Sequence, residues 1–177
     1  MVSSLAVFVA VIVFILLLVL LFELTGLLGA PYVPSENNDI LIAFKKLYKL
    51  SEEDVLVDLG SGDGKVLVIA EGFGARAIGV EINPILVLFS KIRYLKNKNI
   101  SIVCDNMYTF ELPKDTTVVY VYGNTFVVNR IYDRLQKEAK RIKQNLFFIT
   151  NAFDCKNATP IKHIGSYYLY EIKSPGS

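Results

Sequence analysis

The beginning of the chain contains almost no polar positions. In residues 1–22 only Ser3 and Ser4 are polar, and residues 5–22 form an unbroken apolar run. At about 1.5 Å per residue such a helix extends about 27 Å, close to the thickness of a bilayer's hydrocarbon layer. The run therefore predicts a transmembrane anchor within residues 1–30. The alternative, a cleaved signal peptide, usually starts with a basic region, whereas the first basic residue here is Lys45.

The positions of the basic residues predict the orientation of this anchor. All 19 Lys and Arg residues follow the apolar run, and Lys45, Lys46 and Lys49 are the nearest to it. Because basic residues beside a span stay on the cytoplasmic side, we expect a single-pass membrane protein with its C-terminal domain facing the cytoplasm. Cys104 and Cys155 would then remain reduced thiols.

Beyond the anchor, short apolar runs alternate with amphipathic ones. Residues 31–50 form a lead-in that begins Pro-Tyr-Val-Pro, and residues 51–177 form the main domain. We predict helices over 37–50, 65–73, 84–96 and 126–143, and strands over 55–59, 76–81, 100–104, 116–122, 146–150, 160–164 and 167–172. Strands that alternate with helices and end in two consecutive strands predict an α/β fold, with a mostly parallel sheet and an antiparallel C-terminal edge hairpin.

Composition and charge narrow the possible partners. The 19 basic residues nearly balance the 17 acidic ones, which argues against a protein held to nucleic acid by bulk charge. The two cysteines are far apart in the sequence, so neither a disulfide scaffold nor a four-cysteine zinc site is possible. We expect no nucleic-acid partner and no metal.

Residues 58–64, Asp-Leu-Gly-Ser-Gly-Asp-Gly, carry the strongest chemical signal. Gly60, Gly62 and Gly64 allow a sharp turn between a strand and a helix, and they let a ligand approach the backbone closely. The spacing differs from the G-x-G-x-x-G sequence of dinucleotide-binding folds. In addition, Asp63 would repel a pyrophosphate, whereas it suits a ligand that carries an ammonium or a sulfonium group.

Polar residues also follow the next two predicted strands. Glu81 ends the second strand, where a carboxylate can accept both hydroxyl groups of a ribose. Asp105 and Asn106 follow the third strand, where a carboxylate and an adjacent amide can bind an adenine edge. Because the carboxyl ends of parallel strands meet at one edge of the sheet, we expect these groups to line a single ligand site with residues 58–64.

These features together resemble the class I (seven-strand) S-adenosylmethionine-dependent methyltransferases over nearly all of residues 51–173. The resemblance implies a Rossmann-like, doubly wound seven-strand sheet and S-adenosyl-L-methionine as the cofactor. It assigns the cofactor contacts to Asp58, Gly60, Ser61, Gly62, Asp63, Gly64, Glu81, Asp105 and Asn106.

A narrower resemblance adds the anchor, the Pro31-Tyr-Val-Pro34 sequence and residues 79–84, Gly-Val-Glu-Ile-Asn-Pro. With these, the chain is similar to membrane-anchored protein-lysine methyltransferases of mitochondrial carrier and ATP synthase proteins, and to their prokaryotic relatives. This resemblance implies a protein substrate methylated on lysine, and it places Tyr32 near the cofactor. On linker physics alone, residues 31–34 could equally be a stiff spacer between a membrane and the domain.

The methyl acceptor would face the end of the fourth predicted strand. There Tyr122 could contact a lysine ammonium through its ring, and Asn124 could orient the amine. Together with Tyr32 these are the predicted catalytic residues, and no general base is assigned. The sequence lacks the Asn/Asp-Pro-Pro-Tyr/Phe motif of many amino-methyltransferases, which makes DNA-base methylation a poorer interpretation. Tyr122 could also simply pack within the sheet.

Two other functions are compatible with the same features. One is methylation of a lipid or a lipophilic small molecule, which an anchored domain without an inserted lid would also suit. The other is a non-catalytic cofactor-binding membrane protein.

Basic residues on the later helices have more than one interpretation. Such residues usually form a solvated face, but they could also attract anionic lipid head groups. The residues concerned are Lys91, Arg93, Lys96 and Lys98, and then Arg130, Arg134, Lys137 and Arg141.

Overall fold

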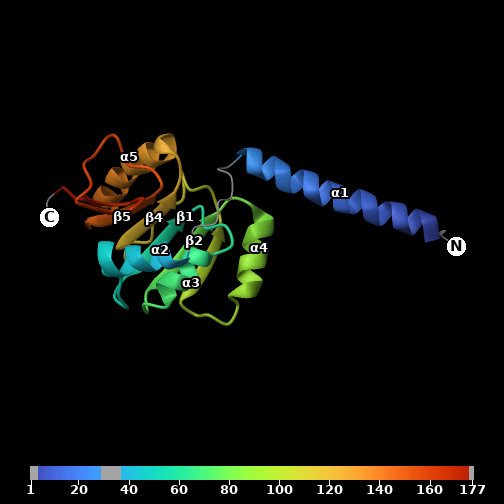
Figure 1. Cartoon of the computed structure of the whole chain (residues 1–177), viewed down its shortest axis with the longest axis horizontal. Helices are drawn as coiled ribbons and strands as arrows, with labels where there is room; N and C mark the ends of the chain where they lie inside the picture. The colour runs from blue at the N-terminus through green and yellow to red at the C-terminus, as the bar shows by residue number, and fades with distance from the viewer. Residues whose placement is uncertain (1–3, 29–36, 176–177) are drawn as a thin grey trace. The chain divides into compact units, whose positions relative to one another are not determined.

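The structure, a computed structural model, describes residues 4–28 and 37–175, and the predicted site residue Tyr32 lies outside them (Figure 1). The chain divides into two units, Met1–Val33 and Pro34–Ser177. The first contains helix α1 (Ser4–Leu28), so the predicted helix over the apolar run is confirmed. Among the helices in the described residues, none was found to have both the length and the apolar content that a membrane crossing requires. The membrane crossing stays a prediction.

The second unit is built on a seven-stranded sheet (Figure 1). Its strands are β1 (Val55–Leu59), β2 (Arg76–Glu81), β3 (Ile100–Cys104), β4 (Val118–Tyr122), β5 (Leu146–Asn151), β6 (Lys162–Ile164) and β7 (Tyr167–Ile172). Their order across the sheet is β3-β2-β1-β4-β5-β7-β6. The first five strands are parallel, whereas β7 pairs antiparallel with β5 and with β6. The predicted seven-strand, doubly wound sheet with an antiparallel C-terminal hairpin is confirmed.

This strand order creates a switch point between β1 and β4. From β1 the chain moves outward through β2 and β3, and it then returns to add β4 on the other side of β1. Ligands of open α/β sheets bind beside the carboxyl ends of the strands at such a point. The fold therefore places a ligand site beside residues 58–64.

The helices of the second unit are α2 (Asn37–Ile42), α3 (Lys65–Glu71), α4 (Pro84–Arg93) and α5 (Thr125–Ile142), with a π-helical turn η1 (Ala43–Leu47) directly after α2. Two asparagines begin the longer helices. Asn83 Oδ1 accepts a hydrogen bond from Ile85 N–H (3.0 Å), and Asn124 Oδ1 accepts one from Val127 N–H (3.1 Å). Both are N-caps, which satisfy amides that have no partner inside the helix.

The predicted helix over 37–50 is wrong at its C-terminal end. The last helical residue is Leu47, and Tyr48 is extended, with φ −120° and ψ 119°. In this conformation the Tyr48 hydroxyl donates a hydrogen bond to Asp54 Oδ1 (2.7 Å). The apolar spacing of the segment continues past the helix because Leu50 is buried in the same core without being helical.

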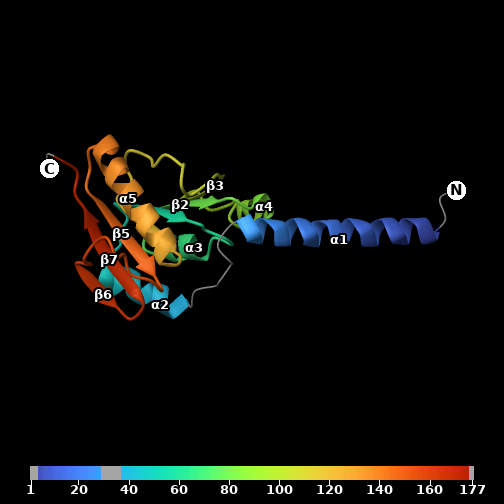
Figure 2. The same ribbon diagram turned by 90° about the horizontal axis from the view of Figure 1, so that it is seen from above.

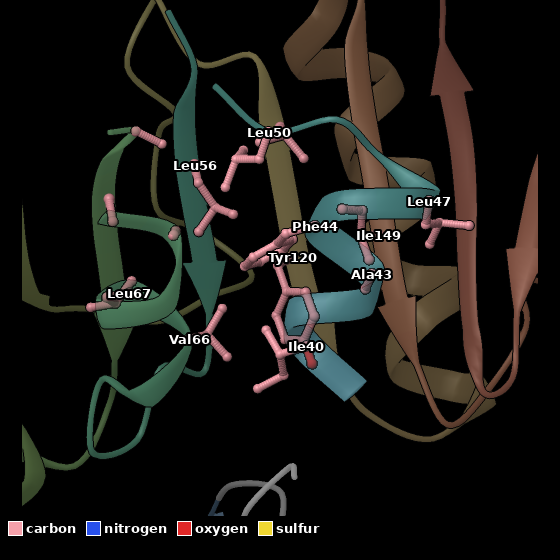
Figure 3. Packing of buried hydrophobic residues seen from close by; sticks show 14 of the residues in the cluster. Ile40, Ala43, Phe44, Leu47, Leu50, Leu56, Val66, Leu67, Tyr120 and Ile149 are labelled. Carbon is pink, nitrogen blue, oxygen red and sulfur yellow. The ribbon is translucent and has the colours of Figure 1, made fainter. Parts of the chain in front are cut away.

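Apolar side chains cover both faces of the sheet, and α5 lies on the face opposite α2 and α3 (Figure 2). On the α2 side, Phe44 contacts Tyr120 edge to face, with ring centroids 6.2 Å apart (Figure 3). On the other side, Ile131 and Leu135 of α5 are fully buried against the sheet. Because β1 is buried along its whole length, its carboxyl end is held rigidly from both faces.

Candidate active site

Asp58, the penultimate residue of β1, is a buried carboxyl group beside the glycine-rich loop. Only 3% of its surface is exposed. Burial, and next the negative charges of Glu81 and Asp63, raise the pKa of Asp58 to about 8. Within the described residues no group donates a hydrogen bond that would offset this. A cation placed beside Asp58 would stabilise its ionised form, as expected of a ligand-binding carboxylate.

Glu81 at the end of β2 holds the loop from one side. Its Oε2 accepts a hydrogen bond from Gly62 N–H (2.9 Å), and its Oε1 accepts one from Asn83 N–H (2.8 Å). Gly60 N–H donates to the carbonyl of Val80, one residue before Glu81 (2.8 Å). Each carboxylate oxygen of Glu81 retains a second lone pair, so it can still accept a ligand hydroxyl.

Helix α4 holds the loop from another side. Ser90 Oγ donates to the Gly62 carbonyl (3.1 Å), and the Tyr94 hydroxyl donates to the Asp63 carbonyl (3.1 Å). Gly64 has a φ of +78°, and a Cβ there would lie 2.5 Å from the Tyr94 ring. Only glycine fits this position, since a side chain would meet both backbone strain and the ring.

The carboxylate of Asp63 lies on the outside of the turn. Its Oδ1 accepts a hydrogen bond from Lys65 N–H (3.2 Å) at the start of α3, and its Oδ2 is 3.5 Å from Arg93 Nη1. Asp63 therefore stabilises the loop and acts on Asp58 through its charge.

Ser61 has a polar atom without a partner. Its Oγ is buried and makes no hydrogen bond to any described residue. It packs against Gly79 of β2, where a Cβ would lie 2.5 Å from that oxygen. The absence of a side chain at residue 79 allows the loop to lie directly against β2.

Asp105 and Asn106 follow β3 at the same edge of the sheet. Asp105 N–H donates to the Glu81 carbonyl (3.1 Å), which joins this turn to the end of β2. The Asp105 side chain is exposed. Asn106 Oδ1 accepts a hydrogen bond from Tyr108 N–H (2.9 Å), so part of the predicted adenine contact also shapes its own turn.

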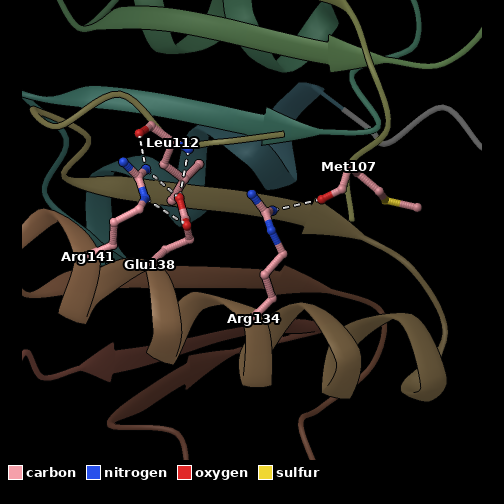
Figure 4. A network of polar contacts seen from close by, with 5 residues as sticks. All are labelled: Met107, Leu112, Arg134, Glu138 and Arg141. Carbon is pink, nitrogen blue, oxygen red and sulfur yellow. Dashed lines mark hydrogen bonds and ion pairs between the residues drawn. The ribbon is translucent and has the colours of Figure 1, made fainter. Parts of the chain in front are cut away.

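The basic stripe on α5 binds the segment that follows Asn106 (Figure 4). Arg134 Nη1 donates to the Met107 carbonyl (2.8 Å), and Arg141 Nη2 donates to the Leu112 carbonyl (2.5 Å). Glu138 completes the group, since its Oε2 accepts from Leu112 N–H (2.8 Å) and from Arg141 Nη2 (2.7 Å). Neither a solvated face nor a lipid-binding surface describes these two arginines.

The same contacts set the ionisation of Glu138. Burial opposes ionisation of the carboxyl, but the hydrogen bonds from Arg141 and Leu112 outweigh it and lower the pKa of Glu138. Nearby, the Arg130 guanidinium lies 3.9 Å from the centre of the Tyr108 ring. The arginines of α5 therefore fix the backbone between β3 and β4.

The predicted acceptor residues lie at the end of β4. Tyr122 is half-buried and pairs with Asn151 of β5, while Asn124 is exposed and caps α5. The described residues thus bring Tyr122 to the same sheet edge as Asp58 and Glu81.

A polar cluster at the ends of β4, β5 and β7 was missed from the sequence. Asn151 Nδ2 donates to the hydroxyl oxygens of Tyr120 (3.2 Å) and Tyr167 (3.3 Å), and its Oδ1 accepts from Ser166 Oγ (3.1 Å). Burial raises the pKa of Tyr167 to about 12, so its hydroxyl stays protonated. The available signal was an asparagine after an apolar strand, at the same place as Glu81 after β2.

The residues present fit an adenosyl ligand with a positively charged group. Asp58 is a buried carboxyl that a cation would ionise, and the Ser61 hydroxyl is a buried donor without a partner among the described residues. The loop that carries Ser61 is fixed in place by Glu81, Ser90 and Tyr94 before any ligand binds.

Residues 58–162 match the ANTKMT methyltransferase domain, and this match covers more than half of the chain. The chain belongs to the ANTKMT methyltransferase family. Membership confirms the predicted class of domain, a class I methyltransferase domain with S-adenosylmethionine as its cofactor.

Two relatives and one solved structure illustrate how far the ANTKMT similarity extends. A protein-lysine N-methyltransferase of Saccharolobus islandicus is 31% identical over 115 residues, which cover 62% of this chain and 70% of that protein. An ATP synthase lysine N-methyltransferase of Xenopus laevis is 40% identical over 63 residues, but these cover 36% of this chain and only 27% of the frog protein. The chain therefore spans about a quarter of that relative.

The solved structure is an RNA methyltransferase from Salinibacter ruber in complex with S-adenosyl-L-homocysteine. It superposes with a TM-score of 0.72 over 80% of this chain and 94% of that one, at 23% identity. At this identity the likeness shows that the two proteins share a fold.

Proposed function

We propose that this chain is a membrane-anchored, S-adenosylmethionine-dependent methyltransferase that methylates lysine side chains of a protein. The observation that carries methyl transfer is Asp58, a buried carboxyl with its pKa raised to about 8 beside a braced glycine-rich loop. The lysine acceptor rests on the Saccharolobus relative, whose name states that activity and of which this chain covers 70%.

We assign the cofactor to the residues around this loop. Asp58 would hold the ammonium group, Glu81 would accept the ribose hydroxyls with its remaining lone pairs, and Asp105 with Asn106 would lie beside adenine. The glycines of residues 60–64 and Ser61 would face the methionyl part of the cofactor. When bound, the cofactor supplies a methyl group on a sulfonium.

On the acceptor side, the chain must orient an amine with a free lone pair. The new N–C bond forms as the C–S bond breaks, and the amine proton leaves to solvent; alignment supplies most of the rate. We propose that the Tyr122 ring contacts the lysine side chain and that Asn124 Oδ1, through its second lone pair, accepts an amine N–H. Tyr32 stays a proposed contact to the cofactor.

We further propose that the apolar helix α1 anchors the chain in a membrane, with the domain on the cytoplasmic side. In this proposal residues 1–30 are the anchor, residues 31–50 the lead-in, and residues 51–177 the methyltransferase domain. The supporting observations are the 18-residue apolar run and the position of every basic residue after it.

Labelling membranes that contain the full chain with methyl-labelled cofactor tests the proposal. We expect the label in a protein band, with mass spectrometry placing methyl groups on lysine. The Asp58→Asn variant is the control for label that does not depend on the site. Label found only in the lipid extract would exclude a protein substrate, and chain released from membranes by alkaline carbonate would exclude the anchor.

A further inference from the structure

Helix α4 has a large exposed apolar face, formed by Leu88, Phe89, Ile92 and Leu95, which we call the outer face of α4. These four side chains are 58%, 65%, 64% and 83% exposed. Leu95 lies just past the last helical residue, Arg93. The helix packs beside β3, the edge strand of the sheet (Figure 2).

The outer face is not an extension of the core. The residues of α4 that face inward are Val87 and Ser90, which are buried, and Tyr94 just beyond the helix is partly buried. At 100° per residue, positions 88, 92 and 95 lie on the opposite side of the helix from positions 87, 90 and 94. The helix is therefore apolar on the side turned away from the sheet, where charged side chains are usual.

The charge around this face has one sign. Residues 82–104 contain four basic residues and no acidic residue. Of the four, Arg93 lies 3.5 Å from the carboxylate of Asp63, while Lys91, Lys96 and Lys98 are exposed. Arg93, Lys96 and Lys98 also line a shallow hollow at the end of α4, whose only acidic residue is Glu71.

We propose that the outer face of α4 binds the surface of an anionic lipid bilayer. An apolar helix face with lysines at its margins and no acid is the pattern of helices that lie in the membrane interface. The apolar side chains would enter the boundary between head groups and acyl chains, while Lys91, Lys96 and Lys98 contact lipid phosphates. This inference depends on neither methyl transfer nor insertion of α1.

The contact has a consequence for the site. Ser90 and Tyr94, on the inner side of α4, hold the cofactor loop through the carbonyls of Gly62 and Asp63. A bilayer against the outer face would therefore lie about one helix diameter, roughly 10 Å, from this loop. The class of substrate that fits is a lysine close to a membrane surface.

The chain contains no tryptophan, so a single introduced indole reports on its own surroundings. We suggest Phe89→Trp in the full chain, reconstituted in vesicles of phosphatidylcholine alone or with about 30% phosphatidylglycerol. The matched control is Ile161→Trp, because Ile161 is 57% exposed and lies beside β6 at the other edge of the sheet. The readout is quenching of the emission by brominated lipids.

We expect the Phe89→Trp variant to be quenched at least about twofold more than the control in anionic vesicles, with blue-shifted emission. Replacing Lys91, Lys96 and Lys98 by Gln in the same variant should weaken the interaction about 100-fold, since each lysine contributes about fivefold near an anionic surface. Equal quenching in the two variants would overturn the proposal. So would a blue shift that depends on protein concentration in vesicle-free detergent, since it would indicate a second copy on this face.

These readouts separate the inference from the proposed anchor. If α1 anchors the chain, both variants float with either type of vesicle, and quenching at residue 89 still depends on the outer face of α4. If α1 does not anchor the chain, flotation itself should require anionic lipid and the three lysines.

Discussion

Asp54 and Asp58 lie at the two ends of β1 and are both buried, yet their surroundings are opposite. Asp54 accepts hydrogen bonds from the Tyr48 hydroxyl (2.7 Å), from Ser51 N–H and Oγ (2.9 and 3.0 Å) and from Thr117 Oγ1 (2.8 Å). Asp58 accepts none from the described residues and faces other carboxylates.

This difference separates a structural carboxylate from one kept for a ligand. Asp54 is fully supplied with donors and ties the lead-in segment, through Tyr48, to the sheet. Asp58 costs the fold free energy when it ionises, because no donor within the described chain compensates for its burial. Such an arrangement persists in a protein where a bound partner provides the missing interaction.

The largest effect should come from Asp54→Asn. This variant leaves several donors facing an amide, so we expect its free energy of unfolding to fall by about 3 kcal/mol. Urea denaturation at neutral pH measures the change. A loss below about 0.5 kcal/mol would contradict the structural role assigned to this carboxylate.

Asp58→Asn should give the converse result. We expect the affinity for S-adenosylhomocysteine to fall about 100-fold, because a buried charge-assisted hydrogen bond is lost. Isothermal titration calorimetry measures it, with the folded fraction of Asp54→Asn as the matched control, in which affinity should change less than about threefold. Similar affinities in the two variants would remove the distinction between the two aspartates.

The pH dependence of stability gives a smaller effect that belongs to Asp58 alone. Its pKa is about 8 in the folded chain against an ordinary value of 3.8, so between these values the folded state holds a proton that the unfolded state has lost. The free energy of unfolding should therefore decline as pH rises through this window and level off above about pH 8.

Asp58→Asn removes the ionisation, so its stability relative to the native chain should rise by about 2 kcal/mol between about pH 5 and pH 8.5. Thermal melts across this range measure the margin. A margin that does not change with pH would mean that Asp58 has no raised pKa.

The sheet was predictable from the sequence because its strands are short apolar runs bounded by turn residues. The predicted bounds of β1, β2, β3 and β7 match the structure. The order of strands and the antiparallel β7 followed from the alternation of elements. The end of the helix near Leu47 could not be predicted, because it depends on the hydrogen bond between Tyr48 and Asp54, which forms only when the chain has folded.

The site was predictable where its residues follow strands, and less so where contacts are distant in sequence. Asp58 and Glu81 meet at the loop as predicted. The spacing of Arg134 and Arg141 identified one face of a helix, but it could not show that this face binds the backbone after β3. Asn151 was missed because its partners come from three different elements.

Helix α5 contacts two parts of the proposed site. It begins at Asn124, where the lysine would arrive, and further along its arginines grip the segment behind Asp105, where the nucleoside would lie. The two substrates thus share one rigid lever. A substitution that tilts α5 should weaken peptide and nucleoside binding together, so across a set of α5 variants the two affinities should covary, even for residues that touch neither molecule.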